Sequence, residues 1–127
     1  MSLGLTEAII IKIKNDPILK VYIEDKVFPI FAENDTPNPY ISIRRKLIES
    51  TYSNDGHCYD DSKIDILITS DNYFDNIKIA QAVRNLFEFK VEKINDVMIF
   101  QCFLENIDET FGIDGYITTI SFAIRSK

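Results

Sequence analysis

The sequence is poor in the residue types from which most enzyme sites are built. Its 127 residues include no tryptophan, four glycines, two cysteines and one histidine. The glycines are scattered, so neither the GxxxxGK nor the GxGxxG spacing of a phosphate-binding loop occurs. Neither Cys58 nor Cys102 has a second Cys or His at ligand spacing, which gives a disulfide framework or a zinc site little support. We therefore expect two ordinary thiols, no metal and no cofactor.

The chain also lacks long apolar runs and an excess of positive charge. No apolar run approaches the ~18 residues of a membrane span, and no basic segment leads into an apolar signal core, so we expect a soluble, intracellular protein without a membrane partner. The net charge of −6 argues against a surface that wraps nucleic acid through its phosphates. Because 46% hydrophobic content is ordinary for a chain that buries a core, we expect residues 1–127 to form a single domain.

One amphipathic stretch, Asp71 to Phe89, organises the predicted fold. Wound as a helix, it gathers four apolar side chains on one side, Ile77, Ala80, Val83 and Phe87. Asp71 is the expected N-cap, since its carboxylate can accept a hydrogen bond from a free backbone N–H. A helix of this length spans four or five strands, so we expect it to cover one face of a sheet.

The N-terminal third predicts two short helices and an edge strand. The first helix should run from Leu3 to Lys14. Asp16 followed by Pro17 is typical of an N-cap and a first helical residue, so a second helix should carry residues 18–23 and form a helical hairpin with the first. Residues 26–30 resemble a strand, but Pro29 removes a ladder donor and restricts them to an edge.

Alternating apolar and polar side chains predict four longer strands, Tyr40 to Glu49, Ser62 to Thr69, Val97 to Asn106 and Tyr116 to Arg125. Residues 50–61 read as a long polar hairpin tip, and residues 108–115 as an acidic turn. The third strand is apolar on both faces, which indicates a central position or a subunit contact. The predicted architecture is α+β, a mostly antiparallel sheet of about four strands with one long helix and an N-terminal helical hairpin packed on one face.

The hairpin tip holds the one local hint of chemistry. His57 stands beside Cys58, but neighbours in an extended segment point to opposite sides, which disfavours a nucleophile and base pair. With Asp60 and Asp61 it offers metal-binding side chains, yet the alternating oxygens, central Gly and terminal Glu of a calcium loop are absent. We therefore predict that the chain is not an enzyme and that this tip is solvated or contacts another subunit.

The order and spacing of several short motifs resemble the tail-completion, or tail-terminator, family of long-tailed bacteriophages. The resemblance covers nearly the whole chain and rests on these pieces: Asp16-Pro17, Val27-Phe28-Pro29, Pro39-Tyr40-Ile41-Ser42-Ile43, Tyr52 with Asp55 and Gly56, Ala80-Gln81-Ala82-Val83-Arg84, and Ile120-Ser121-Phe122-Ala123-Ile124. The chain departs from the family in its Ile-, Asn- and Asp-rich composition and in carrying His57 and Cys58 at the hairpin tip.

This resemblance implies a structural protein that caps the tail tube, usually as a ring of six copies, and on which the head connector docks. Its partners would be further copies of itself, the tube protein and the connector, while DNA would pass without specific binding. Its location would be the virion tail of a phage, or the cytoplasm of a bacterial host that expresses a prophage.

A ring needs two different patches that bind head to tail. The candidate interface residues are Tyr52, Asn54, Asp55, Gly56 and His57 in the hairpin tip, and Ile99, Gln101 and Phe103 on the second face of the third strand. Two other classes of function stay open. One is a different phage neck, minor tail or tail-assembly component, and the other is a small cellular ligand-binding domain or enzyme whose site is assembled from distant residues.

Overall fold

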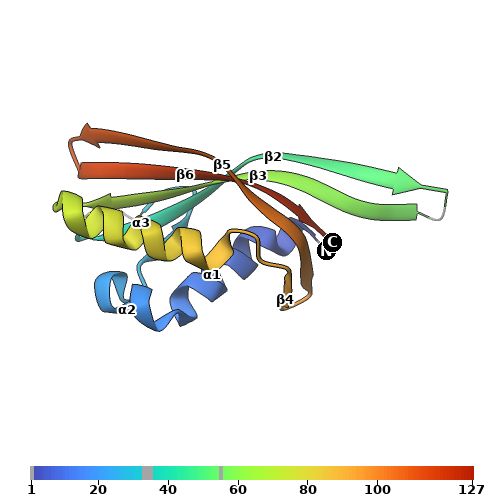
Figure 1. Ribbon diagram of the computed structural model, residues 1–127, viewed down its shortest axis with the longest axis horizontal. Coiled ribbons are helices and arrows are strands. Elements are labelled where there is room, and N and C mark those ends of the chain that lie inside the picture. The colour runs from blue at the N-terminus through green and yellow to red at the C-terminus, as the bar shows by residue number, and fades with distance from the viewer. Residues whose placement is uncertain (1, 33–35, 55) are drawn as a thin grey trace.

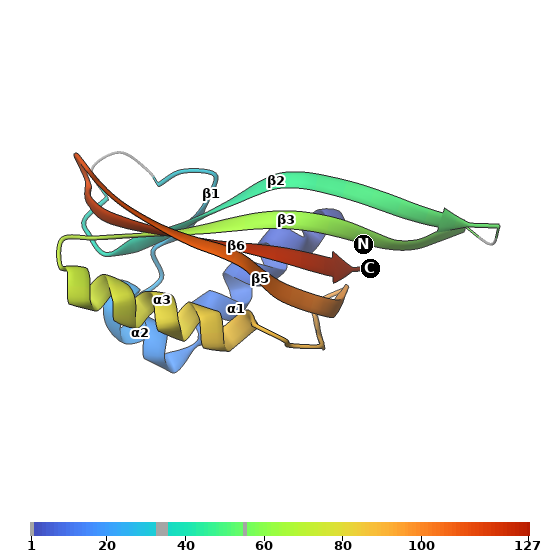
Figure 2. The same ribbon diagram turned by 45° about the horizontal axis from the view of Figure 1, so that its top comes forward.

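The computed structural model describes residues 2–32, 36–54 and 56–127 (Figure 1). A short 3-10 turn, η1 (Ser2–Gly4), precedes the helices α1 (Leu5–Asn15), α2 (Pro17–Ile23) and α3 (Tyr73–Phe87). The strands are β1 (Val27–Pro29), β2 (Tyr40–Ser53), β3 (Gly56–Ser70), β4 (Glu92–Ile94), β5 (Val97–Gly112) and β6 (Gly115–Ser126). All three helices lie on the same side of the sheet in both views (Figures 1 and 2).

The six strands of the described residues form one mixed sheet in the order β1-β2-β3-β6-β5-β4. β1 is parallel to β2, and the other neighbours are antiparallel. The expected architecture of about four strands with one long helix and an N-terminal helical hairpin is therefore wrong, since the described residues form six strands and three short helices. The edge strand expected within residues 26–30 is present as β1, whereas β4, with three residues, is too short for an alternating pattern to reveal.

Both hairpins are much longer than the sequence pattern indicated. β2 and β3 pair from Tyr40↔Thr69 to Ser53↔Gly56, so the expected polar tip at residues 50–61 is mostly strand. β5 and β6 pair as far as Gly112↔Gly115, so most of the expected acidic turn is also strand. The far part of the β2–β3 hairpin runs past the helices (Figure 2). Because no helix covers this part, it needs no apolar face, and the alternation that marks a half-buried strand is missing.

The first two helices form as their local chemistry predicts. Asp16 caps α2, because its carboxylate accepts a hydrogen bond from the Leu19 backbone N–H at 3.0 Å and Pro17 occupies the first turn. α1 begins at Leu5 and buries Leu5, Ala8, Ile9 and Ile13 against the sheet. Both helices therefore contribute an apolar face to the core.

The buried face of α3 is rotated from the predicted one. The N-cap is Asn72, whose side-chain oxygen accepts hydrogen bonds from the N–H groups of Phe74 and Asp75, so the expected cap Asp71 is wrong. The buried residues are Asn76, Ile79, Ala80, Val83 and Phe87. Ile77 is 36% exposed at the border of this face.

The centre of the sheet is β3 and β6, not β5. Their inward side chains, with those of β2, carry much of the core, namely Ile41, Ile43, Ile64, Ile66, Ile68, Ile120, Phe122 and Ile124. β5 lies between β6 and the short β4, so most of it runs along the edge. The apolar residues on both faces of β5 therefore do not indicate a central strand.

Candidate assembly surfaces

The β2–β3 hairpin projects from the body as a two-stranded arm (Figures 1 and 2). Pairing of β3 with β6 begins at Asp60↔Ser126, so within the described residues the chain from Tyr52 to Tyr59 is covered by no third strand. Tyr52 is 69% exposed near the tip. Asn54 is also exposed, and Gly56 adopts a φ of 114°, a conformation that favours glycine.

The other residues of the predicted tip are His57 and Asp55. The backbone of His57 lies opposite Tyr52 in the ladder. Asp55 lies outside the described residues. The structure thus places Tyr52, Asn54 and Gly56 on an exposed arm, and the role of the tip in subunit contact stays a prediction.

The predicted residues of β5 divide between its two faces. Ile99 is 2% exposed and belongs to the core, so its assignment to an outer surface is wrong. Gln101 and Phe103 are exposed on the face away from the helices. A register shift between Ile99 and Gln101 inserts Phe100 as an extra residue. Such a bulge reverses which later residues point inward. The prediction assumed strict alternation from Val97 without a bulge, and it therefore put Ile99 and Phe103 on the same face.

The tip and the β5 face are separate surfaces. Gln101 pairs with Arg125, which pairs with Asp61 near the base of the arm. Tyr52 lies further out, beyond the end of β6. The two groups of candidate residues therefore lie apart. A head-to-tail contact requires two separate patches of this kind.

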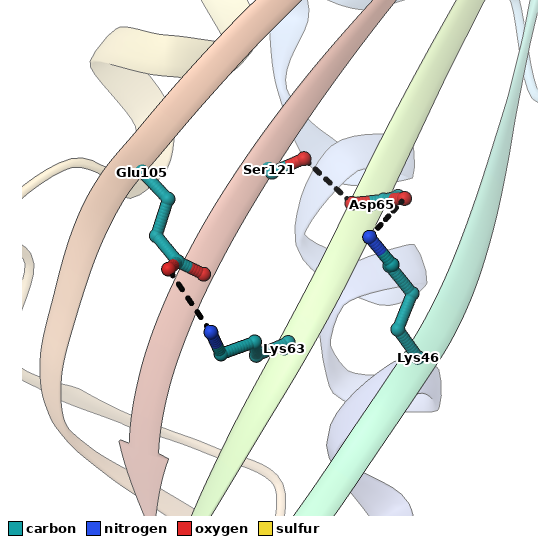
Figure 3. Close-up of polar contacts among 5 residues, drawn as sticks. All are labelled: Lys46, Lys63, Asp65, Glu105 and Ser121. Carbon is teal, nitrogen blue, oxygen red and sulfur yellow. Dashed lines mark hydrogen bonds and ion pairs between the residues drawn. The ribbon is translucent and has the colours of Figure 1, made fainter.

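Ion pairs and hydrogen bonds cross four strands on the outer face of the sheet (Figure 3). Lys46 Nζ of β2 lies 3.8 Å from Asp65 Oδ2 of β3, and the Ser121 hydroxyl of β6 donates to Asp65 Oδ1 at 2.6 Å. Lys63 Nζ lies 3.2 Å from Glu105 Oε2 of β5. Exposed pairs contribute only ~0–1 kcal/mol each, so they hold neighbouring strands in register more than they stabilise the fold.

Arg125 completes this network at the base of the arm. Its Nε and Nη2 donate to the two carboxylate oxygens of Asp61 at 2.9 and 3.2 Å, and its guanidinium carbon lies 4.0 Å from the centre of the Tyr59 ring. The hydrogen bond to Asp61 raises the pKa of Arg125, so the guanidinium stays charged. Beside it, Leu47, Lys63 and Phe103 help to line a groove of about 230 Å³. Small-molecule sites usually measure ~300–1,000 Å³, so this groove is a poor ligand pocket.

Two exposed aromatic clusters were not predicted. The Phe89 ring, 70% exposed, lies 6.0 Å from the Phe103 ring, and the Phe89 N–H donates to Cys102 O at 2.8 Å. The second cluster contains Tyr73, Phe74, Phe111 and Tyr116, with neighbouring rings 4.9 to 5.9 Å apart. Large exposed apolar groups are typical of protein contacts. The sequence gives no signal for them, because the same residues would fit a core.

Cys102 is a buried thiol in the core. Burial raises the pKa of Cys102 to about 12, which leaves almost no thiolate at neutral pH. The described residues contain no group of three or more His, Cys, Asp and Glu side chains that could hold a metal ion. In the described part of the chain no helix is long and apolar enough to cross a membrane.

Comparison with known proteins finds a shared fold but no sequence family. No family model and no curated protein matches the sequence. A chain from a solved structure of the virion of a native gene transfer agent particle superposes with a TM-score of 0.76 and 13% identity, over 96% of this chain and 93% of that one. The two chains share one fold. A second solved protein, whose name states no function, matches with a TM-score of 0.61 and 14% identity, over 100% of this chain and 96% of its own.

Proposed function

We propose that this chain is a non-enzymatic structural protein of a phage or phage-like particle, which caps the tail tube as a ring of six copies and joins it to the head connector. The observation that carries the proposal is the nearly full-length likeness, at a TM-score of 0.76, to a chain of a gene transfer agent virion. A virion component does its work by assembling with other proteins. Its active parts are therefore surfaces and not pockets.

The finer role as a tail cap is supported by the resemblance of several short motifs to those of the tail-completion family. Asp16-Pro17 opens a helix and Val27-Phe28-Pro29 forms an edge strand, so these motifs hold defined structural positions. Two contacts of about 800 Å² per copy would cover roughly a fifth of the 7329 Å² surface of one copy. The net charge of −6 also suits a ring through which DNA passes without sticking.

The experiment that tests this role is electron microscopy of tail tubes mixed with the purified protein. The proposal predicts one ring-shaped cap on one end of each tube, and that capped tubes stop growing in the presence of free tube protein. As a separate arm, immobilised connector protein should retain capped tubes and not bare ones. Tubes that keep growing with bare ends would contradict the proposal.

The exposed arm allows a sharper form of this test. Tyr52→Ala removes a large apolar surface near the tip without touching the core, since Tyr52 is 69% exposed. We expect an unchanged melting temperature and weaker capping. Val21→Ala is the matched control, because Val21 is 79% exposed on α2, away from the arm, and its loss should leave capping intact. If Tyr52→Ala caps tubes like the unmodified protein, the arm tip has no role in assembly.

A different neck, minor tail or tail-assembly component is the second candidate, and the same shared fold supports it. The microscopy separates the two. A protein of that kind would join the particle at another place, or leave it, without closing a tube end.

A further inference from the structure

Exposed aromatic rings gather at the start of α3. Phe74 of α3 and Phe111 of β5 are 74% and 71% exposed. Tyr73 and Tyr116 lie between them, with ring centres 5.5 Å apart. The exposed parts of Phe74, Phe111 and Tyr73 amount to roughly 300–400 Å², because an aromatic side chain has about 150–250 Å² of surface. A patch of this size matches the largest apolar patch of a typical monomer, which is often functional.

Negative charge surrounds these rings. The carboxylates within two residues of a ring in the sequence are Asp71, Asp75, Glu109 and Asp114. In the described part of the chain none of the four forms an ion pair, and Lys78, one turn after Phe74, offsets only one of their charges. We call the four rings and the four carboxylates the acidic aromatic patch.

Hydrogen bonds hold the acidic aromatic patch in one shape. The Tyr73 hydroxyl donates to Glu109 Oε2 at 3.0 Å. The Asn38 amide donates to Asp71 Oδ1 at 2.6 Å and to Asp114 O at 2.9 Å, which ties the start of α3 to the turn between β5 and β6. A surface that is already ordered loses less conformational entropy when a partner binds.

A second apolar group lies beyond the end of α3. The rings of Phe89 and Phe103 have centres 6.0 Å apart, and Val91 is 63% exposed. The charges here are positive. Lys90 and Lys93 are exposed, and neither forms an ion pair with another described residue. We call these five residues the basic aromatic patch.

The carboxylates near the basic aromatic patch are already neutralised. Glu88, Glu92 and Glu105 each form an ion pair with a cation of the same copy. Burial, and then the charge of Lys90, lower the pKa of Lys12, so positive charges already lie close together here. Carboxylates of a partner would relieve this repulsion.

The two patches lie too far apart to meet within one copy. α3 has 15 residues and is therefore roughly 22 Å long. One patch includes its first residue, Tyr73, and the other follows its last, Phe87 (Figure 1). Two acidic patches repel each other, as do two basic ones, whereas an acidic and a basic patch attract. The charges therefore select contact between unlike patches of different copies.

We infer that copies of this chain join head to tail, with the acidic aromatic patch of one copy against the basic aromatic patch of the next. This inference rests on the assembly of several copies proposed above. The apolar side chains bury one another, and Lys90 and Lys93 can lie over ring faces while they approach the carboxylates. Contact between two different patches is heterologous, which is the kind of contact from which rings and filaments are built.

Two double variants disable one patch each. Phe74→Ala with Asp114→Lys changes the acidic aromatic patch, and Phe89→Ala with Lys90→Glu changes the basic one. All four residues are exposed, so the core is untouched. Each variant alone should need about tenfold or more protein for half-maximal assembly, because it loses apolar contact and sets like charges against each other.

A mixture of the two variants tests whether the contact joins unlike patches. Each variant keeps the patch that the other has lost, so one copy of each should form a two-copy species near twice 14.7 kDa and nothing larger. Sedimentation velocity separates this species from the monomer and from larger assemblies. The matched control is Ile18→Ala with Lys20→Glu, which removes an exposed apolar side chain and reverses an exposed charge on α2. Circular dichroism checks that each variant is folded.

Zero-length cross-linking serves for copies that assemble only on a tube. A carbodiimide joins an ammonium group directly to a carboxylate, and mass spectrometry identifies the linked peptides. The inference predicts links from Lys90 or Lys93 to Asp75, Glu109 or Asp114. Such links arise between copies, since the two patches lie at opposite ends of α3.

The outcomes separate this inference from the proposed function. Weaker assembly of each variant, a two-copy mixture and an unchanged control support patch contact, as do the predicted links where assembly needs a tube. Normal assembly of either variant, a mixture that stays monomeric when the unmodified protein assembles in solution, or tube-dependent assembly without these links overturns patch contact but leaves tube capping in place. Patch-dependent assemblies that leave tube ends bare keep the contact and overturn the capping role. An unmodified protein that forms no assembly alone or on tubes overturns both.

Discussion

Asn76 is the residue whose removal tests the fold most sharply. It is a polar side chain with 0% exposure, and it ties α3 to the two central strands. Its amide nitrogen donates to Ile68 O of β3 and to Tyr116 O of β6, both at 3.0 Å, and its oxygen accepts from the Thr118 hydroxyl. Buried amides are kept only where their hydrogen bonds are satisfied, and here all three are made.

Asn76→Ala should lower the free energy of unfolding by about 3 kcal/mol. Each lost hydrogen bond contributes about 0.5–1.5 kcal/mol, and the partners left buried without it add to the cost. Thr118→Val removes only one of the three bonds and should cost about 1 kcal/mol. Because the two residues share that bond, the double variant should cost about 1 kcal/mol less than the sum of the single ones.

Urea unfolding followed by circular dichroism measures these differences. The slope against urea should stay constant, so that the shift in midpoint reports stability alone. A loss of less than about 1 kcal/mol in Asn76→Ala, or strict additivity with Thr118→Val, would refute this view of the buried amide.

Three further predictions concern single positions. Gly115→Ala should cost about 2–4 kcal/mol, because φ is 113° and the new Cβ would lie 2.6 Å from a backbone oxygen, while Gly56→Ala, with φ 114° and open space, should cost less in the same urea assay. Asp16→Ala should lose about 1 kcal/mol by removing the cap of α2; an unchanged midpoint would contradict the cap. Cys102, with its pKa of about 12, should resist thiol reagents near pH 8 until the protein unfolds, while half-buried Cys58 is labelled sooner. Equal labelling rates of the native protein, followed by mass spectrometry, would count against the burial of Cys102.

The parts of the fold that depend on local chemistry were predictable. Asp16 and Pro17 mark the start of α2 because cap and first-turn preferences act within one turn of helix. The turns of both long hairpins are likewise set by a few residues. Each turn ends at a glycine with positive φ, Gly56 at the start of β3 and Gly115 at the start of β6.

The extent of the strands was not predictable. Residues 50–53, 56–61 and 108–112 are strand because they continue a hairpin already begun, and their outward side chains carry no burial signal. β4 pairs with Val97 to Ile99, but a three-residue strand is too short to show a burial pattern in the sequence. The edge strand predicted within residues 26–30 is present as β1. The rotation of α3 has a similar cause. The polar Asn76 is buried because carbonyl oxygens of β3 and β6, far away in the sequence, accept hydrogen bonds from its amide.

The candidate surface was predictable in part. Gln101 and Phe103 are exposed as expected, but the bulge at Phe100 sends Ile99 into the core, and nothing in the residue pattern marks a bulge. The exposed position of Tyr52 follows from its place in the predicted polar hairpin tip. The exposure of Phe89 does not, since it depends on where α3 ends relative to the edge of β5.

The central claim, that copies of this chain form a ring that caps a tube, is tested most directly by mass. Multi-angle light scattering should be run at low and high protein concentration, and on the complex recovered from tail-tube ends. The account predicts a species near six times 14.7 kDa, alone at high concentration or on the tube. A strict monomer at every concentration that also leaves tube ends bare would contradict it.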